Sequence, residues 1–179
     1  MTDDQRHASK RPDVLTFETE ALEDPVTLAG EIQAQLDVIL STTDADFVVK
    51  IIDVFPPDHP DFAHNPDNIE MGSYQMLVRA EVMRGRFRDD FSNPKPFRAG
   101  QETEVNFTLQ DMLHTFKPGH KIMVQIHSTW FPYIDRNPQK YVDNIMEANA
   151  EDFIKSEIKV LGTSTVCVGK SNPKKVARP

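Results

Sequence analysis

The residues of this chain best suited to chemistry are its six histidines, a short run of arginines and one aromatic segment. His59 and His64 lie among aspartates in a loop over residues 56–68, where imidazole and carboxylate groups could bind a metal ion. Their spacing matches no metal-ligand pattern, and Asp, Asn and Pro are also the residues of ordinary turns. His114 and His120 flank a predicted turn, where a hydrogen bond to the fold is the simpler role. We therefore predict no metal site and no cofactor.

The sequence motifs of common catalytic sites are missing. A serine hydrolase of the nucleophile-elbow type carries its serine in G-x-S-x-G, and the segment 71–75 lacks the second glycine of that pattern. The glycine-rich patterns that bind phosphate are also absent. A free-standing hydrolase that used His127 with Asp111 is the remaining enzymatic hypothesis, and it is disfavoured. We expect no catalytic residue in this chain.

Arg84, Arg86 and Arg88 stand close together in the sequence Arg-Gly-Arg-Phe-Arg. Guanidinium groups bind carboxylates and phosphates through paired hydrogen bonds, so a ligand clamp is one interpretation. Ion pairing, within the domain or across an interface, is the other and is favoured because the protein is acidic. By sequence, the candidate acidic partners are Asp53, Glu81, Asp89 and Asp90.

The segment 119–138 combines a strand with an aromatic loop. Ile122, Val124 and Ile126 occupy alternate positions, the period of a half-buried strand. The chain then presents its only tryptophan, Trp130, within Ser-Thr-Trp-Phe-Pro-Tyr. An aromatic loop without a catalytic motif indicates a docking surface rather than a reaction centre. Trp130 could equally cap the core of its own domain, and the sequence does not separate these two roles.

The elements that must position these residues are mostly strands. Residues 46–54 are apolar on nearly both faces, which predicts a central strand covered on both sides. The best helix candidate is residues 142–153, and Cys167 is expected in the core. Strands are predicted over residues 13–17, 26–29, 31–40, 46–54, 74–82, 102–109, 121–129 and 157–168.

Short strands joined by long, proline-rich connections predict an all-β fold, an antiparallel β-sandwich with Greek-key or jelly-roll wiring and at most one or two short helices. We place a linker or N-terminal arm at residues 1–12, the sandwich at residues 13–168 and a flexible tail at residues 169–179.

Composition narrows the classes of partner. A net charge of −8 and a pI near 5.2 argue against nucleic acid, which requires a basic face. No apolar run reaches the roughly 18 residues that would cross a membrane, so no membrane partner is expected. The polar N-terminus has no apolar region of the kind found in signal peptides. The cellular compartment stays open.

Six short motifs occur in order along the chain. They are residues 44–56 (DADFVVKIIDVFP), 74–79 (YQMLVR), 84–88 (RGRFR), 109–120 (LQDMLHTFKPGH), 128–132 (STWFP) and 136–138 (RNP). Together they resemble the C-terminal domain of the X-Pro dipeptidyl-peptidase and cocaine-esterase family, nearest its α-amino-acid ester hydrolase and glutaryl acylase branch. The resemblance runs from about residue 13 to residue 168, and residues 2–20 resemble the linker that enters this domain.

The resemblance implies a non-catalytic jelly-roll β-sandwich of the galactose-binding-domain type. This domain is expected to pack on an α/β-hydrolase catalytic domain, in the same polypeptide or in a separate chain, and to help shape its active-site region. None of the catalytic triad motifs lies in this chain. The side chains expected to face the catalytic domain are Trp130, Phe131, Pro132, Tyr133, Arg136 and Asn137, with Arg84, Arg86 and Arg88 as a second group. The alternative is a free-standing carbohydrate-binding module that uses Trp130, Tyr133 and Arg136. A homo-oligomer also stays open.

Overall fold

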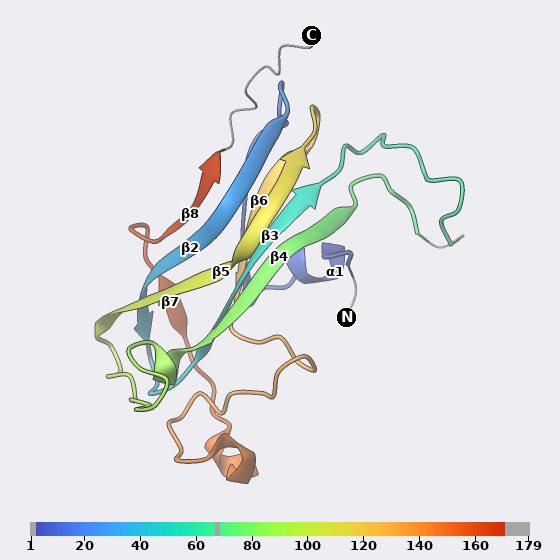
Figure 1. Cartoon of the computed structure of the whole chain (residues 1–179). Coiled ribbons are helices and arrows are strands. Elements are labelled where there is room, and N and C mark those ends of the chain that lie inside the picture. Colours follow the sequence, from blue (N-terminus) through green and yellow to red (C-terminus); the bar gives the residue numbers. More distant parts are fainter. Residues whose placement is uncertain (1–2, 67–68, 171–179) are drawn as a thin grey trace.

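The computed structural model describes residues 3–66 and 69–170, which form a sandwich of two antiparallel sheets (Figure 1). The first sheet has the strand order β1-β6-β3-β4; in the second, β5 pairs with β2, which also pairs with β7 and β8. The strands are β1 (Val14–Glu18), β2 (Val26–Leu40), β3 (Asp46–Val54), β4 (Gln75–Arg84), β5 (Glu102–Phe116), β6 (Lys121–His127), β7 (Ile158–Val160) and β8 (Thr165–Lys170). The prediction of an all-β sandwich is confirmed.

Strand β3 lies inside the first sheet, and all nine of its residues are buried. Phe47, Val49 and Ile51 belong to the core between the sheets, whereas Ile52 belongs to a smaller apolar cluster. The N-terminal segment covers part of the strand's other face, where Gln5 contacts Lys50. The prediction that residues 46–54 form a doubly covered strand is confirmed.

Strands β2 and β5 form the long pair of the second sheet, with 15 residues each. Gly30 has a φ of +99° and stands at a bulge, where the register with β5 shifts. Glycine accepts this backbone conformation without steric cost. The two strands predicted on either side of Gly30 are therefore one continuous strand, and β5 continues seven residues past its predicted end at Leu109.

The strand predicted over residues 157–168 is wrong as a single element. It is two short strands, β7 and β8, separated by a turn, and both pair with β2. The register of β8 turns Val166 and Val168 toward the core and leaves Cys167 exposed, so the core position predicted for Cys167 is also wrong. β8 ends at Lys170, two residues inside the predicted tail; the rest of that tail lies outside the described residues.

The helix predicted over residues 142–153 is wrong. Two isolated 3-10 turns, Ile145–Glu147 and Ala150–Asp152, occupy the segment. The side chain of Asn144 accepts a hydrogen bond from the N–H of Met146, and such local bonds compete with helix propagation. The α-helix that the described residues do contain, α1 (Arg6–Ser9), lies in the predicted N-terminal arm. No helix in the described ranges is long and apolar enough to span a membrane.

Asp53 links the two sheets at one end of the sandwich. Its two carboxylate oxygens bond to Nε2 of His114 at 2.8 Å and to Nδ1 of His120 at 2.7 Å. Asp53 belongs to the first sheet and His114 to the second, so this bond joins the sheets. The hydrogen-bonded role predicted for both histidines is confirmed. The loops over residues 85–101 and 128–157 gather at the opposite end (Figure 1).

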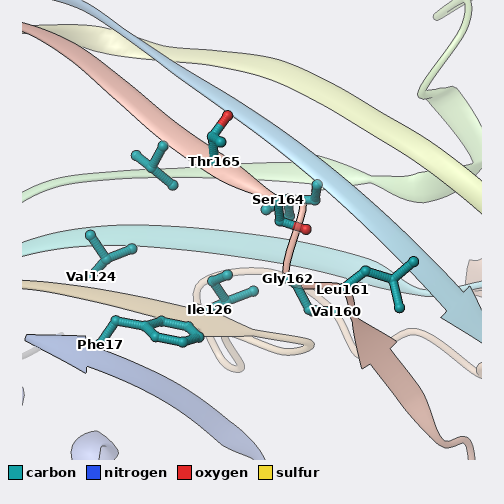
Figure 2. Close-up of a pocket in the computed structure, with 10 residues that line it drawn as sticks. Phe17, Val124, Ile126, Val160, Leu161, Gly162, Ser164 and Thr165 are labelled. Carbon is teal, nitrogen blue, oxygen red and sulfur yellow. The ribbon is translucent and has the colours of Figure 1, made fainter.

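The two sheets separate along one edge around an apolar cavity of about 350 Å³ (Figure 2). Phe17, Val124 and Ile126 line it from the first sheet, and Val160 and Val166 from the second. No charged side chain lines the cavity. It is an opening of the core at the sheet edge, and the hydroxyls of Ser164 and Thr165 in its lining bond to β2.

Candidate functional site

The aromatic loop, residues 128–138, follows β6 and turns sharply at Trp130. The carbonyl of Trp130 accepts hydrogen bonds from the N–H groups of Tyr133 (2.8 Å) and Ile134 (3.2 Å). This turn leaves Phe131 and Tyr133 64% and 61% exposed. Pro132 is exposed as well. Large aromatic side chains open to water at one site are typical anchors of protein interfaces.

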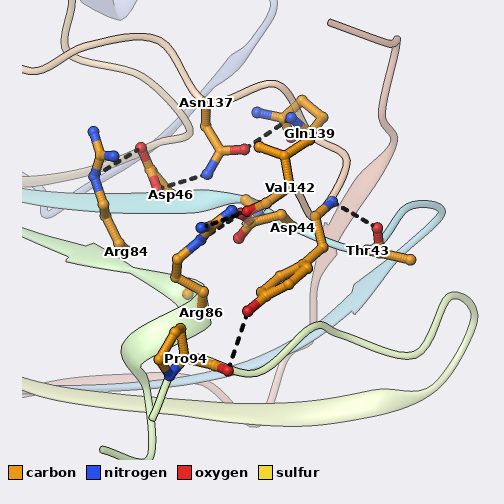
Figure 3. A network of polar contacts seen from close by, with 12 residues as sticks. Thr43, Asp44, Asp46, Arg84, Arg86, Pro94, Asn137, Gln139 and Val142 are labelled. Atoms are coloured by element: carbon orange, nitrogen blue, oxygen red, sulfur yellow. Dashed lines mark hydrogen bonds and ion pairs between the residues drawn. The ribbon is translucent and has the colours of Figure 1, made fainter. Parts of the chain in front are cut away.

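A buried ion pair holds the chain just beyond this loop. Arg86 donates from Nε and Nη2 to Oδ2 of Asp44, at 2.9 and 2.6 Å, and from Nη1 to the carbonyl of Val142 at 2.9 Å (Figure 3). Its guanidinium also lies 4.6 Å from the centre of the Tyr141 ring. Burial raises the pKa of Asp44, although Arg86 opposes the shift. Arg86 is 4% exposed, and its guanidinium donates to groups within the domain.

A second buried carboxylate, that of Asp46, holds the loop itself. Asn137 donates from Nδ2 to Oδ1 of Asp46 at 2.9 Å and accepts from the N–H of Gln139 at 2.8 Å (Figure 3). Arg84 places Nε 3.9 Å from Oδ2 of Asp46 and pairs with Asp135 of the loop. Burial raises the pKa of Asp46 to about 6, despite the bond from Asn137. Asn137 is thus an internal support of the loop, and Arg84 bridges the sheet to it.

Arg88 lies apart from the aromatic loop. It donates to the carbonyls of Gly85, Lys95 and Pro96, and its guanidinium lies 4.2 Å from the centre of the Phe97 ring. These contacts close the loop over residues 89–97. The structure therefore brings Arg84 and Arg86 close to the aromatic loop but leaves Arg88 elsewhere.

The favoured ion pairing is confirmed for Arg84 and Arg86, but the acidic partners named from the sequence are wrong. The partners are Asp44, Asp46 and Asp135 rather than Asp53, Glu81, Asp89 and Asp90. Asp53 instead bonds to two histidines, and Asp89 pairs with Lys95. Glu81, Asp89 and Asp90 lie near the arginines in the sequence. The antiparallel pairing of β3 with β4 instead brings Asp46 opposite Arg84.

Trp130 is half-buried and packs against a lysine that the sequence did not single out. Nζ of Lys50 lies 4.5 Å from the centre of the Trp130 ring and donates to Oε1 of Gln5 at 2.9 Å. Lys50 is 2% exposed. Its burial, with a smaller effect from Arg11, lowers the pKa of Lys50 from 10.5 to about 8. The signal that could have found Lys50 is its charge in the middle of an apolar strand.

A cavity of about 540 Å³ lies beside Lys50, between α1 and the aromatic loop. We call it the Lys50 pocket; Lys50, Arg11, Asp13, His127, Phe131 and Arg136 are among its lining residues. Arg11 bonds to Asp13 through both Nε and Nη2. Arg136 is exposed at the pocket, and its guanidinium lies 5.7 Å from the centre of the Phe153 ring.

His127 also lines the Lys50 pocket, and its imidazole is neutral. Its Nε2 bonds to Oε1 of Gln125 at 2.9 Å. Burial, followed by the charge of Lys50, lowers the pKa of His127 to about 3. Asp111 lies on β5, in the other sheet, so the structure does not form the His127–Asp111 pair that a free-standing hydrolase would need.

His59 does not contribute to a metal site in the described part of the chain. Its ring packs against Phe55 and Phe62, and Nδ1 lies 2.9 Å from the carbonyl of Pro60. Within residues 3–66 and 69–170, no three His, Cys, Asp or Glu side chains are placed to hold a metal ion.

Comparison with known proteins assigns this architecture. The family model described as the X-Pro dipeptidyl-peptidase C-terminal non-catalytic domain matches residues 2–177, almost the entire chain. The chain belongs to this family.

Proteins similar to this chain are much longer than it, and the chain matches only about a quarter of each. The cocaine esterase of Rhodococcus sp. (strain MB1 Bresler) is 37% identical over 134 residues, which cover 75% of this chain and 21% of that protein. Two solved structures are similar. A selenomethionine-labelled α-amino acid ester hydrolase has a TM-score of 0.85 and 42% identity, over 94% of this chain and 27% of its own. An aminopeptidase from the marine sediment archaeon Thaumarchaeota archaeon has a TM-score of 0.79 and 46% identity, over 88% and 25%.

Proposed function

We propose that this chain is the non-catalytic C-terminal domain of a serine hydrolase of the X-Pro dipeptidyl-peptidase and acyl-ester-hydrolase type. It packs on an α/β-hydrolase domain, in the same polypeptide or as a separate chain, and helps shape the active-site region. The observation that carries the proposal is coverage: the chain is matched over most of its length but spans only 21–27% of these relatives. A domain of this kind needs no catalytic residue of its own.

The surface proposed to face the catalytic domain is the tip of the aromatic loop. Phe131, Pro132, Tyr133 and Arg136 are exposed there, while Asn137 anchors the base of the loop to Asp46. An exposed aromatic ring that becomes buried contributes about 2 kcal/mol. A loop held in place before binding loses little conformational entropy on association. The loop therefore combines apolar area with a fixed shape.

The first experiment identifies the hydrolase. The gene upstream of residue 1, in the same frame or as a neighbouring gene, is read for G-x-S-x-G, and that domain is co-expressed with this chain. We expect the two to purify together and to hydrolyse an activated ester, whereas the chain alone gives no turnover above background. Absence of any such hydrolase, or its failure to bind this chain, would refute the proposal.

The carbohydrate-binding alternative is less well supported. Trp130 is half-buried and contacts both Lys50 and Tyr133, so less of its ring is open for a sugar to stack on. Binding of the isolated chain to a glycan array would revive this alternative, and inertness there together with hydrolase binding would remove it. Light scattering of the purified chain tests the remaining possibility of a homo-oligomer.

A further inference from the structure

The Lys50 pocket carries an excess of positive charge in an acidic protein. Its charged lining residues are Lys50, Arg11, Arg136 and Asp13, which sum formally to three positive charges and one negative charge. Asp13 is already engaged by Arg11 through two hydrogen bonds. His127 adds no charge, because its buried imidazole is neutral near pH 7. Lys50 and Arg136 are thus left without a compensating carboxylate in the pocket, while the chain as a whole has a net charge of −8.

Of these two cations, Lys50 is buried and Arg136 is exposed. The ammonium group of Lys50 is nearly inaccessible in a pocket wall, and among the described residues it forms no ion pair. Its contacts are one amide oxygen and one aromatic face. Buried charges in proteins are ordinarily paired or bound to a counter-ion, because desolvation without compensation is costly. An ammonium group in the wall of a cavity of about 540 Å³ is therefore suited to pair with an anionic group that enters the cavity from outside the domain.

We infer that the Lys50 pocket receives an acidic side chain of the catalytic domain, whose carboxylate pairs with Lys50 and Arg136. This inference rests on the proposed function and names the chemistry of the contact. The pocket adjoins the exposed aromatic tip, since Phe131 belongs to both. α1 forms its other wall, within the segment that resembles the linker into this domain. A carboxylate inserted beside a buried aromatic anchor fixes the orientation of one domain on the other, because charge complementarity chooses a single register.

Crosslinking tests the inference directly on the complex. A carbodiimide joins an amine to a carboxylate only where the two are in contact. After treatment of the wild-type complex with the hydrolase identified above, mass spectrometry should find Lys50 joined to an Asp or Glu of the hydrolase. Lys159 is the control, because it lies on β7 of the other sheet beside Glu157 of its own chain. A complex in which Lys50 carries no link to the hydrolase while other lysines do would overturn the inference.

Affinity measurements separate this inference from the proposed function. Lys50→Met keeps the apolar stem and removes the charge, Arg136→Gln changes an exposed residue that should not affect folding, and Lys159→Met is the matched control. Truncating one member of a desolvated interfacial charge pair should weaken binding at least about tenfold. We expect that loss for Lys50→Met, a smaller loss for Arg136→Gln, and a change within about twofold for Lys159→Met. If the wild-type chain does not bind the hydrolase, the proposed function fails. If it binds and Lys50→Met binds equally well, only this inference fails.

A third measurement tests whether the Lys50 pocket binds a free anion instead of a side chain of the hydrolase. Glutarate and inorganic phosphate are titrated into the isolated chain, with chloride at matched ionic strength as the control, and the fluorescence of Trp130, the only tryptophan, reports on the pocket. Saturable binding of either anion, combined with hydrolase affinity that is insensitive to Lys50→Met, would assign the pocket to a free ligand and overturn the inference. Weak glutarate binding that disappears in the hydrolase complex would support it.

Discussion

Replacing Lys50 by methionine should stabilise the isolated chain near neutral pH. The pKa of Lys50 falls from 10.5 to about 8 on folding, chiefly through burial, and a difference of about 2.5 units corresponds to about 3 kcal/mol against the charged form. Methionine removes this cost and keeps a chain of similar length. It also loses the bond to Gln5 and the contact with Trp130, together worth about 1–2 kcal/mol. The net expectation is a gain of about 1–2 kcal/mol at pH 7.

The gain should disappear in alkaline solution. Below pH 8 Lys50 is charged in both the folded and the unfolded chain, so its burial cost is fully present. Between pH 8 and 10.5 the unfolded chain binds more protons than the folded chain, and the stability of the wild type rises with pH relative to the variant. Above that window the folded lysine is neutral without penalty. The variant then lacks contacts that the wild type retains, and its advantage is lost.

Urea unfolding of both chains, followed by circular dichroism at pH 7 and pH 10.5, measures this difference. A gain of about 1–2 kcal/mol corresponds to a rise in Tm of about 3–6 °C for a chain of this size. Taking the difference between variant and wild type cancels the titration of the other lysines and tyrosines. A variant less stable than the wild type at pH 7, or a difference that does not change with pH, would show that Lys50 is adequately compensated within its own domain.

Three further substitutions test other parts of the structure. Arg86→Met leaves Asp44 buried without its partner and should cost about 3–5 kcal/mol in urea unfolding; a loss below about 1 kcal/mol would contradict the role given to this pair. Asp53→Ala removes the acceptor of two histidines and should cost about 1–3 kcal/mol, a reading that unchanged stability would reject. Phe131→Ala should alter unfolding by less than about 0.5 kcal/mol but weaken hydrolase binding by about 2 kcal/mol, whereas Phe91→Ala, a control at a still more exposed ring, should leave binding unchanged.

The strands were predictable where side-chain alternation is regular. In β2, Ile32, Ala34, Leu36 and Val38 are all buried, as their period-2 spacing indicates. The break near residue 160 is signalled by Gly162 and Ser164, turn-forming residues between two apolar runs, and the prediction of a single strand overlooked that signal. The helix prediction over residues 142–153 failed for a related reason. Helical spacing can be recognised, but the capping preferences of Asn144 and Asn149 break the segment into separate turns.

The candidate site was predictable in its exposed part and hidden in its buried part. Phe131 and Tyr133 were recognised because aromatic residues in a proline-bounded loop are conspicuous in any sequence. Asp44 and Arg86 are 42 residues apart, and only the fold brings them together. Lys50 was overlooked because the prediction of a strand covered on both faces rested on its apolar residues and did not say what covers the lysine. In the structure the N-terminal segment covers that face, so the lysine lies inside the domain.

The buried lysine and the exposed aromatic tip have one physical explanation if both belong to an interface. In the isolated domain each has a cost: Lys50 is desolvated without a carboxylate, and Phe131 and Tyr133 expose apolar rings to water. Association with a domain that supplies a carboxylate and an apolar surface removes both costs together. The loop that carries the aromatic tip is already fixed by the Asp46–Asn137 bond, so association need not order it. A domain whose isolated form holds an uncompensated charge beside an exposed aromatic anchor is therefore expected to be most stable in its complex.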